Sequence, residues 1–245
     1  MILRRLTEHL RHDKWFTVFL ELAVVVVGLF LAFQLDRWYE SQRGKFGLQA
    51  HLVSLAEDFA ENETLLNLAI SVGTQEMDAT ITLRAEIRKD TPDLSVAELN
   101  LLVSKTSLLP TFGPVNLAYK NLISDDSVAD LLNPDLKKAL AEFYAAHEIT
   151  KLIQNTQELQ YVTIWQPYAM ENLDYAASNR KIRAGRDTAV LRPYLDPDLI
   201  LAAMKTKQFE NVLVIQWETA EDLVADWSAN LERVKRIQAM LPSPN

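Results

Sequence analysis

Residues 15–35 read WFTVFLELAVVVVGLFLAFQL, and this stretch decides how the rest of the chain is placed. The run holds a single charged side chain, Glu21. A helix of about 20 apolar residues crosses the roughly 30 Å hydrocarbon core of a bilayer. Trp15 opens the run, and Trp38 and Tyr39 follow it, a spacing that places aromatic rings at both membrane interfaces. The sequence therefore predicts one transmembrane helix over residues 15–35.

Two other interpretations of this run fit the sequence less well. A helix buried in a soluble core seldom combines this length with aromatic residues at both ends. A cleaved signal peptide has an apolar region of about 7–15 residues that ends in a small-x-small site. This run is longer, and no such site precedes Asp36. We expect an uncleaved signal-anchor.

The basic residues around the span favour one orientation. Residues 1–14 form a short basic segment with four Arg or Lys side chains, against three in residues 36–45. The positive-inside rule then places the N-terminus in the cytoplasm. In a bacterium, the extramembrane domain of residues 36–245 would be periplasmic. We expect a single-pass protein of the bacterial inner membrane.

One stripe of the span has the composition of a helix–helix interface. Glu21, Val25, Gly28 and Ala32 follow one another at three- and four-residue steps, and Leu35 continues the stripe. Small residues such as Gly28 and Ala32 let two membrane helices approach closely. Charged residues in a span tend to face protein or water. Two interpretations stay open: an association face for a second copy or another membrane protein, or a Glu21 that reaches toward the headgroups beside an incidental glycine.

The extramembrane domain has the composition of an all-α fold. The chain contains only 6 glycines and 9 prolines in 245 residues, and Leu and Ala are abundant. Apolar residues recur at helical spacing after the span, so we expect the transmembrane helix to continue as one long amphipathic helix that ends near Arg88. Its expected buried residues are Leu48, Leu52, Leu55, Phe59, Leu66, Ile70, Met77 and Ile81.

Capping signals place the later helices. Ser95 and Glu98 form a capping box, and the pairs Asn133-Pro134 and Asp196-Pro197 combine an N-cap residue with proline at the first helical position. The helix from Asn133 is expected to run toward Tyr175 with a kink at Pro167. A last helix spans about residues 208–241, and strand signals are weak. These patterns predict an extramembrane helical bundle into which the long helix packs.

Several short motifs carry a resemblance to a known family. They are DRWYE at residues 36–40, NLAYKNL at residues 116–122, LLNPDL at residues 131–136, and Phe143-Tyr144. In this order the chain resembles an uncharacterised family of bacterial single-pass membrane proteins with a helical domain of unknown function. The resemblance implies a bacterial cell membrane and implies no activity. Residues 123–127 depart from it, because they lack the glycine expected in the turn of the family.

Composition and motifs offer little for catalysis. The net charge of −8 makes nucleic acid an unfavourable partner, and the absence of cysteine excludes disulfides and thiolate metal sites. The four histidines lack a third metal ligand at a recognisable spacing. No glycine-rich phosphate loop and no Gly-x-Ser-x-Gly turn is present. We expect no enzyme, no metal and no cofactor.

One basic cluster stands out in the acidic domain. It consists of Arg180, Lys181, Arg183 and Arg186. Such a cluster can contact anionic lipid or an acidic partner. It can equally be a solvated loop between helices, and the sequence leaves both interpretations open.

Taken together, these features predict a membrane-anchored helical interaction or scaffold protein of the bacterial cell envelope. Its expected partners are the lipid bilayer and either a second copy or another membrane protein. The alternative is a membrane-tethered sensor or ligand-binding domain that works through a partner.

Overall fold

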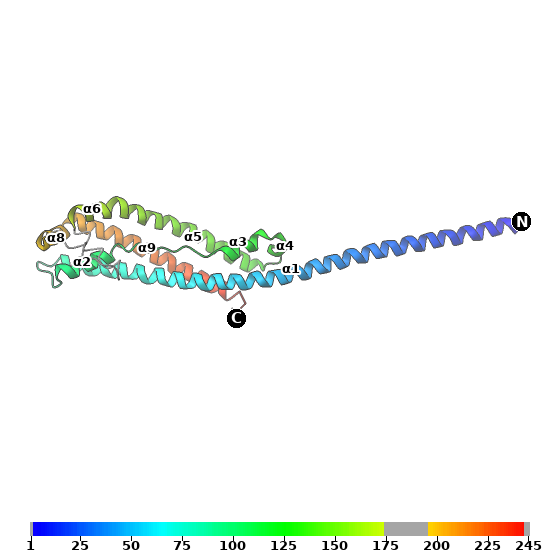
Figure 1. Cartoon of the computed structure of the whole chain (residues 1–245), viewed down its shortest axis with the longest axis horizontal. Coiled ribbons are helices and arrows are strands. Elements are labelled where there is room, and N and C mark those ends of the chain that lie inside the picture. The colour runs from blue at the N-terminus through cyan, green and yellow to red at the C-terminus, as the bar shows by residue number, and fades with distance from the viewer. Residues whose placement is uncertain (1, 174–195, 243–245) are drawn as a thin grey trace, which may run out of the picture. The chain divides into compact units, whose positions relative to one another are not determined.

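The computed structural model describes residues 2–173 and 196–242 (Figure 1), without the side chains of residues 2–18, 37–38, 40–41 and 126–127. Within these ranges the chain is helical and contains no strand, which confirms the all-α prediction. The chain divides into two compact units. The first comprises Met1–Leu52 with Tyr119–Leu132, and the second comprises Val53–Ala118 with Asn133–Asn245.

Helix α1 (Ile2–Ile87) runs from the N-terminal end of the chain through the first unit into the second. No proline interrupts this sequence, so every backbone N–H in its interior can donate within the helix. The window Phe19–Asp36 is wholly exposed, and in the described ranges it is the one helical stretch long and apolar enough to span a membrane or to act as a signal sequence. The predicted apolar N-terminal helix is confirmed, and its insertion into a membrane stays a prediction.

In the first unit, α1 is joined by most of α3 (Leu117–Ser124) and by α4 (Asp126–Ala129). Leu122, Val128 and Leu132 are buried there. A Cβ built on Gly47 would lie 3.4 Å from Cγ2 of Val128, an ordinary van der Waals contact. Gly44, one turn earlier, is buried. This face of α1 is therefore covered by α4.

The second unit is built on three long helical stretches. They are the C-terminal part of α1, α5 (Pro134–Gln160) and α9 (Lys207–Gln238), which lie side by side in Figure 1. Shorter elements complete the unit: α2 (Val96–Lys105), the π-helical turn η1 (Tyr161–Trp165), α6 (Gln166–Asn172) and α8 (Pro197–Met204). A ring contact at 5.2 Å between Phe59 and Phe143 joins α1 to α5, and a contact at 5.5 Å between Tyr168 and Phe209 joins α6 to α9.

The buried face of α1 in this unit follows a strict heptad pattern. Buried residues recur at alternating steps of four and three, the 3.5-residue period of coiled-coil packing: Leu55, Phe59, Asn62, Leu66, Ala69, Gly73, Glu76, Thr80, Leu83 and Ile87.

The predicted buried face of α1 is wrong beyond Leu66. Ile81 is 53% exposed, and Ile70 and Met77 are only half-buried. The inward positions from Ala69 to Thr80 belong to small and polar residues, among them Gly73 and Glu76. A pattern of apolar residues cannot reveal a face whose members are not apolar.

The helix starts follow their predicted caps. The side chains of Ser95 and Glu98 form the capping box, with the Ser95 N–H donating to Glu98 Oε2 at 2.8 Å. Asn133 Oδ1 accepts from the Asp135 N–H at 2.8 Å, and Asp196 Oδ1 accepts from the Asp198 N–H at 2.9 Å. These contacts are local, so the sequence alone could indicate them.

A π-helical turn over Tyr161–Trp165 precedes Pro167, where the sequence predicts a kink. The N–H of Gln166 donates to the carbonyl of Tyr161, five residues earlier. Pro167 follows at the start of α6, where its missing N–H is tolerated best. The helix ends at Asn172 rather than at Tyr175, whose structure lies outside the described residues.

Candidate interaction surfaces and a buried polar layer

The predicted association residues of the span all lie on the surface of α1. Glu21, Val25, Gly28 and Ala32 are exposed, and a Cβ built on Gly28 would meet no atom within 4 Å. The first unit therefore leaves this stripe open to lipid or to another helix.

The predicted interfacial aromatics continue along the same helix. The side chains of Trp15 and Trp38 lie outside the described part of the chain. Tyr39 is 68% exposed and lines a hollow of about 320 Å³ together with Gln42, Arg43 and Phe46. Sequence reasoning missed Phe46, although its place seven residues after Tyr39 was the signal that could have found it.

The basic cluster of Arg180, Lys181, Arg183 and Arg186 lies outside the described residues. Its proposed contact with anionic lipid or an acidic partner stays a prediction.

A second exposed apolar surface, which the sequence reasoning missed, runs along the outer side of α5, η1 and α6. We call it the outer stripe, and its members are Ile149, Leu152, Leu159, Val162 and Met170. Val162 and Met170 border a shallow hollow of about 580 Å³ beside Pro167. Single exposed apolar residues are common on proteins, but a group of them along one helix can mark an interaction site. The steps from Ile149 to Leu152 and then to Leu159 were the available signal.

The interior of the second unit contains an unusual number of polar side chains. Most of them have partners: Asn62 both donates to and accepts from the backbone of Val115, at 3.0 and 2.7 Å, and Asn230 donates to Thr150 Oγ1 at 2.9 Å. The buried polar residues are Asn62, Glu76, Thr80, Glu86, Asn100, Ser104, Thr106, Ser107, Thr150, Gln157, Gln216, Thr219 and Asn230.

Asn100, Gln157 and Gln216 each have one buried side-chain atom without a hydrogen-bond partner among the described residues, and Glu76 has two. The Glu76 side chain is fully buried, and within the described part of the chain neither carboxyl oxygen has a hydrogen-bond partner. Burial alone raises the pKa of Glu76 to about 8, because the charged form loses its hydration. At neutral pH the carboxyl is therefore mainly protonated. Sequence reasoning passed over Glu76 because a glutamate on a helix is usually solvated.

Helices approach closely one turn before Glu76. A Cβ built on Gly73 would lie 2.6 Å from Cγ2 of Val224 and 3.3 Å from the Trp227 ring. Only glycine fits between α1 and α9 at this spacing without a shift of these side chains. This close approach of α1 and α9 excludes water next to Glu76. It helps to explain why the Glu76 carboxyl group is desolvated.

His147 is packed rather than poised for chemistry. Its ring lies edge-on to Phe112, with 5.6 Å between the ring centroids. Burial lowers the pKa of His147, so the neutral imidazole is favoured. Across residues 2–173 and 196–242, no group of three His, Asp or Glu side chains is placed to hold a metal ion.

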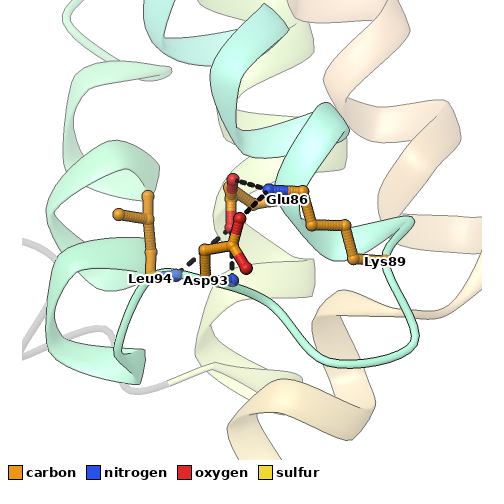
Figure 2. Close-up of polar contacts among 4 residues, drawn as sticks. All are labelled: Glu86, Lys89, Asp93 and Leu94. Atoms are coloured by element: carbon orange, nitrogen blue, oxygen red, sulfur yellow. Dashed lines mark hydrogen bonds and ion pairs between the residues drawn. The ribbon is translucent and has the colours of Figure 1, made fainter.

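A polar network closes the turn between α1 and α2 (Figure 2). Glu86 Oε2 accepts from the backbone N–H groups of Asp93 at 2.9 Å and Leu94 at 3.2 Å, and Lys89 pairs with both Glu86 and Asp93. The hydrogen bond from Lys89, reinforced by the two backbone donors, holds the pKa of Glu86 below its usual value. Because each charge in this group has a partner, we assign the network to the structure of the turn.

Comparison with protein-family models, with curated proteins and with solved structures finds no match to this chain. The resemblance to an uncharacterised family of bacterial membrane proteins therefore stays a prediction.

Proposed function

We propose that this chain is a membrane-anchored helical interaction protein of the bacterial cell envelope, and the proposal contains no catalytic step. The observation that carries it is the continuity of α1. One uninterrupted helix presents the exposed apolar window Phe19–Asp36 and then supplies the heptad face that packs the second unit. A helix shared in this way is a direct mechanical link between a membrane and a folded domain.

The outer stripe supports the interaction half of the proposal. Its side chains are apolar and exposed, and the second unit already has a separate packed core. A partner helix with its own apolar face would cover the stripe and remove it from water. The proposed topology has residues 1–14 in the cytoplasm and residues 36–245 on the outer side of the inner membrane, as the positive-inside rule favours.

The anchoring half is tested by fractionation of membranes. We expect the full chain to stay with the membrane after an alkaline wash, with residues 1–36 present in its intact mass. Placing arginine at both Val26 and Leu29 should release it, because each arginine at the centre of a span costs about 2.5–3.5 kcal/mol on the insertion scale. A wild-type protein recovered in the soluble fraction, or one that lacks residues 1–36, would contradict the proposal. A reporter that is active only outside the cytoplasm, fused after Asn245, tests the orientation.

The buried polar side chains of the second unit, Glu76 above all, favour a second candidate function. This function is a membrane-tethered sensor that acts through a partner. A domain with a buried neutral carboxyl changes stability when that group ionises, and such a change can be transmitted by the same long helix. The pH dependence of unfolding, argued for Glu76 in the Discussion, is its first test.

A further inference from the structure

We propose that the face of α1 from Val25 to Phe46 binds a second copy of this chain in parallel, as a left-handed coiled coil that begins in the membrane and continues beyond it. We call this face the seam. The inference rests on the proposed function, because a parallel pair requires that both copies be anchored in the same direction. It adds the identity of the partner and an interface outside the lipid.

The seam has the heptad spacing of a coiled coil. Val25, Ala32, Tyr39 and Phe46 are each seven residues apart, and Gly28, Leu35 and Gln42 form a second series that alternates with them. Steps of three and four therefore continue without a slip across the end of the apolar window. A sustained 3.5-residue period predicts left-handed supercoiling of two helices.

Lipid does not account for the outer part of the seam. Phe46, at the outer end of the seam, is 77% exposed. At about 1.5 Å per residue, Phe46 lies roughly 15 Å beyond Asp36 along the helix. The headgroup layer adds only about 5–8 Å on each side of the hydrocarbon core. In the proposed topology Phe46 stands in water unless protein covers it.

The surface at this level has the form of a coiled-coil socket. The hollow of about 320 Å³ is lined by Tyr39, Gln42, Arg43 and Phe46. These residues stand at positions i, i+3, i+4 and i+7, the four-residue set that forms the hole for one knob of a facing helix. In a parallel pair in register, the knob for this hole is Gln42 of the second copy.

The remaining elements of the first unit leave the seam free. Gly44 is buried, and Gly47 lies against Val128 of α4. Gln42 and Phe46 each stand two residues from Gly44, which is about 200° around a helix of 3.6 residues per turn. The covered face and the seam are therefore on opposite sides of α1 in this unit.

A second copy suits the seam better than a different helix does. Two copies of a single-pass chain insert in one direction, so each seam residue meets its counterpart at the same depth. Gly28 and Ala32 then meet within lipid, where close backbone approach drives association. Phe46 meets its counterpart outside the lipid, where water drives apolar rings together. No charged residue lies on the seam from Val25 to Phe46. We begin the interface at Val25, because Glu21 would face a second carboxylate.

The area available is consistent with a stable pair. Four largely exposed aromatic rings from two copies would bury on the order of 400–700 Å², since a buried aromatic side chain covers about 150–250 Å². Standard specific interfaces bury about 1,200–2,000 Å² in total. The remaining seam residues, which extend over three further helical turns into the span, are positioned to supply the difference.

The absence of native cysteine makes a direct test possible. Single cysteines are placed in the full chain at Tyr39, at Gln42 and, as an exposed control about 100° around the helix from Phe46, at Lys45. Two differently tagged copies are co-expressed, and their membranes are then treated with a mild oxidant. We expect mixed-tag disulfide dimers for Tyr39→Cys and Gln42→Cys at several times the yield of Lys45→Cys.

A second pair of variants tests the membrane part of the seam. In the Gln42→Cys background, Gly28→Ile should lower the dimer yield several-fold, whereas Val27→Ile, on another face, should leave it unchanged. Equal yields from Gln42→Cys and Lys45→Cys, equal effects of the two isoleucines, or crosslinks only to a different protein would overturn the proposal. Membrane-bound protein without seam crosslinks refutes the pair alone, and protein absent from membranes refutes the proposed anchoring as well.

Discussion

Glu76 shows how one residue can set the pH response of a helical domain. Its carboxyl is buried with no charged group among the causes of its raised pKa, so ionisation is opposed by desolvation alone. Most buried carboxyls in proteins are paired. The helix nevertheless places Glu76 inward, because Ala69, Gly73, Thr80 and Leu83 on the same heptad face hold that face against the core.

We therefore predict that the stability of the domain falls as the pH rises. The Glu76 pKa is 4.5 in the reference state and about 8 in the folded chain. Between these values the folded state keeps a proton that the unfolded state has lost. The free energy of unfolding therefore falls by about 1.4 kcal/mol for each pH unit, on the order of 4–5 kcal/mol over the window. Glu76→Gln should remove most of this slope. Urea unfolding of the detergent-solubilised chain at pH 5, 6, 7 and 8 measures it.

The comparison of the wild type with Glu76→Gln separates the effect of this residue from that of the other titrating groups. Because they share those groups, only the difference between their stability curves reports on Glu76. Parallel curves from pH 5 to pH 8 would show that the carboxyl reaches water in the folded state, and they would remove the support for a sensor function.

At the scale of elements, the chain uses side chains to close the end of its longest helix. In the turn after α1, the backbone N–H groups of Asp93 and Leu94 donate hydrogen bonds to Glu86 (Figure 2). Lys205, which ends α8, donates to the carbonyls of Lys89 at 2.9 Å and Asp90 at 2.6 Å. Two separate stretches of sequence thus satisfy backbone groups of the turn that follows α1.

We predict that Glu86→Ala lowers the melting temperature more than Asp93→Ala does. The first change leaves two backbone donors and Lys89 without their shared acceptor, whereas Asp93 contributes one exposed ion pair. Because the pKa of Glu86 is depressed, its contribution is complete above the ordinary carboxyl pKa and is lost as the pH falls through the lowered value. Thermal unfolding at pH 7 compares the two variants, and an equal loss would assign the network no special role.

At the scale of the whole molecule, the proposed function depends on two exposed apolar surfaces with different tasks. The seam on α1 is proposed for a second copy, and the outer stripe on α5, η1 and α6 for a different protein. Each lies within one unit, so each can be altered without a change in the other.

We predict that Leu152→Glu on the outer stripe abolishes crosslinking to a partner in the envelope. Leu152 is 66% exposed, so the substitution removes no core contact. The matched control is Leu68→Glu on α1, where the leucine is 62% exposed and lies away from the stripe. In vivo crosslinking from whole membranes, with the seam dimer followed in the same samples, makes the measurement. Loss of the same crosslinked band in both variants would mean that general surface polarity, and not the stripe, governs the contact.

The sequence by itself determined what depends on neighbouring residues. The apolar window is a property of consecutive side chains, and the caps at Ser95, Asn133 and Asp196 act over three residues or fewer, so both were predictable. The sequence predicted a kink at Pro167, because proline lacks an N–H, but it did not predict the π-helical turn that precedes this residue.

Only the tertiary structure decided which faces are covered. The inward face of α1 beyond Leu66 contains glycine, threonine and glutamate, and their burial depends on α9, more than a hundred residues away in the sequence. The raised pKa of Glu76 follows from that burial. The outer stripe has the same apolar character as buried positions of α5 such as Leu136 and Leu140, and it differs only in that no helix within residues 2–173 and 196–242 covers it. Hydropathy records the character of a side chain, whereas burial is a relation between segments that the sequence keeps far apart.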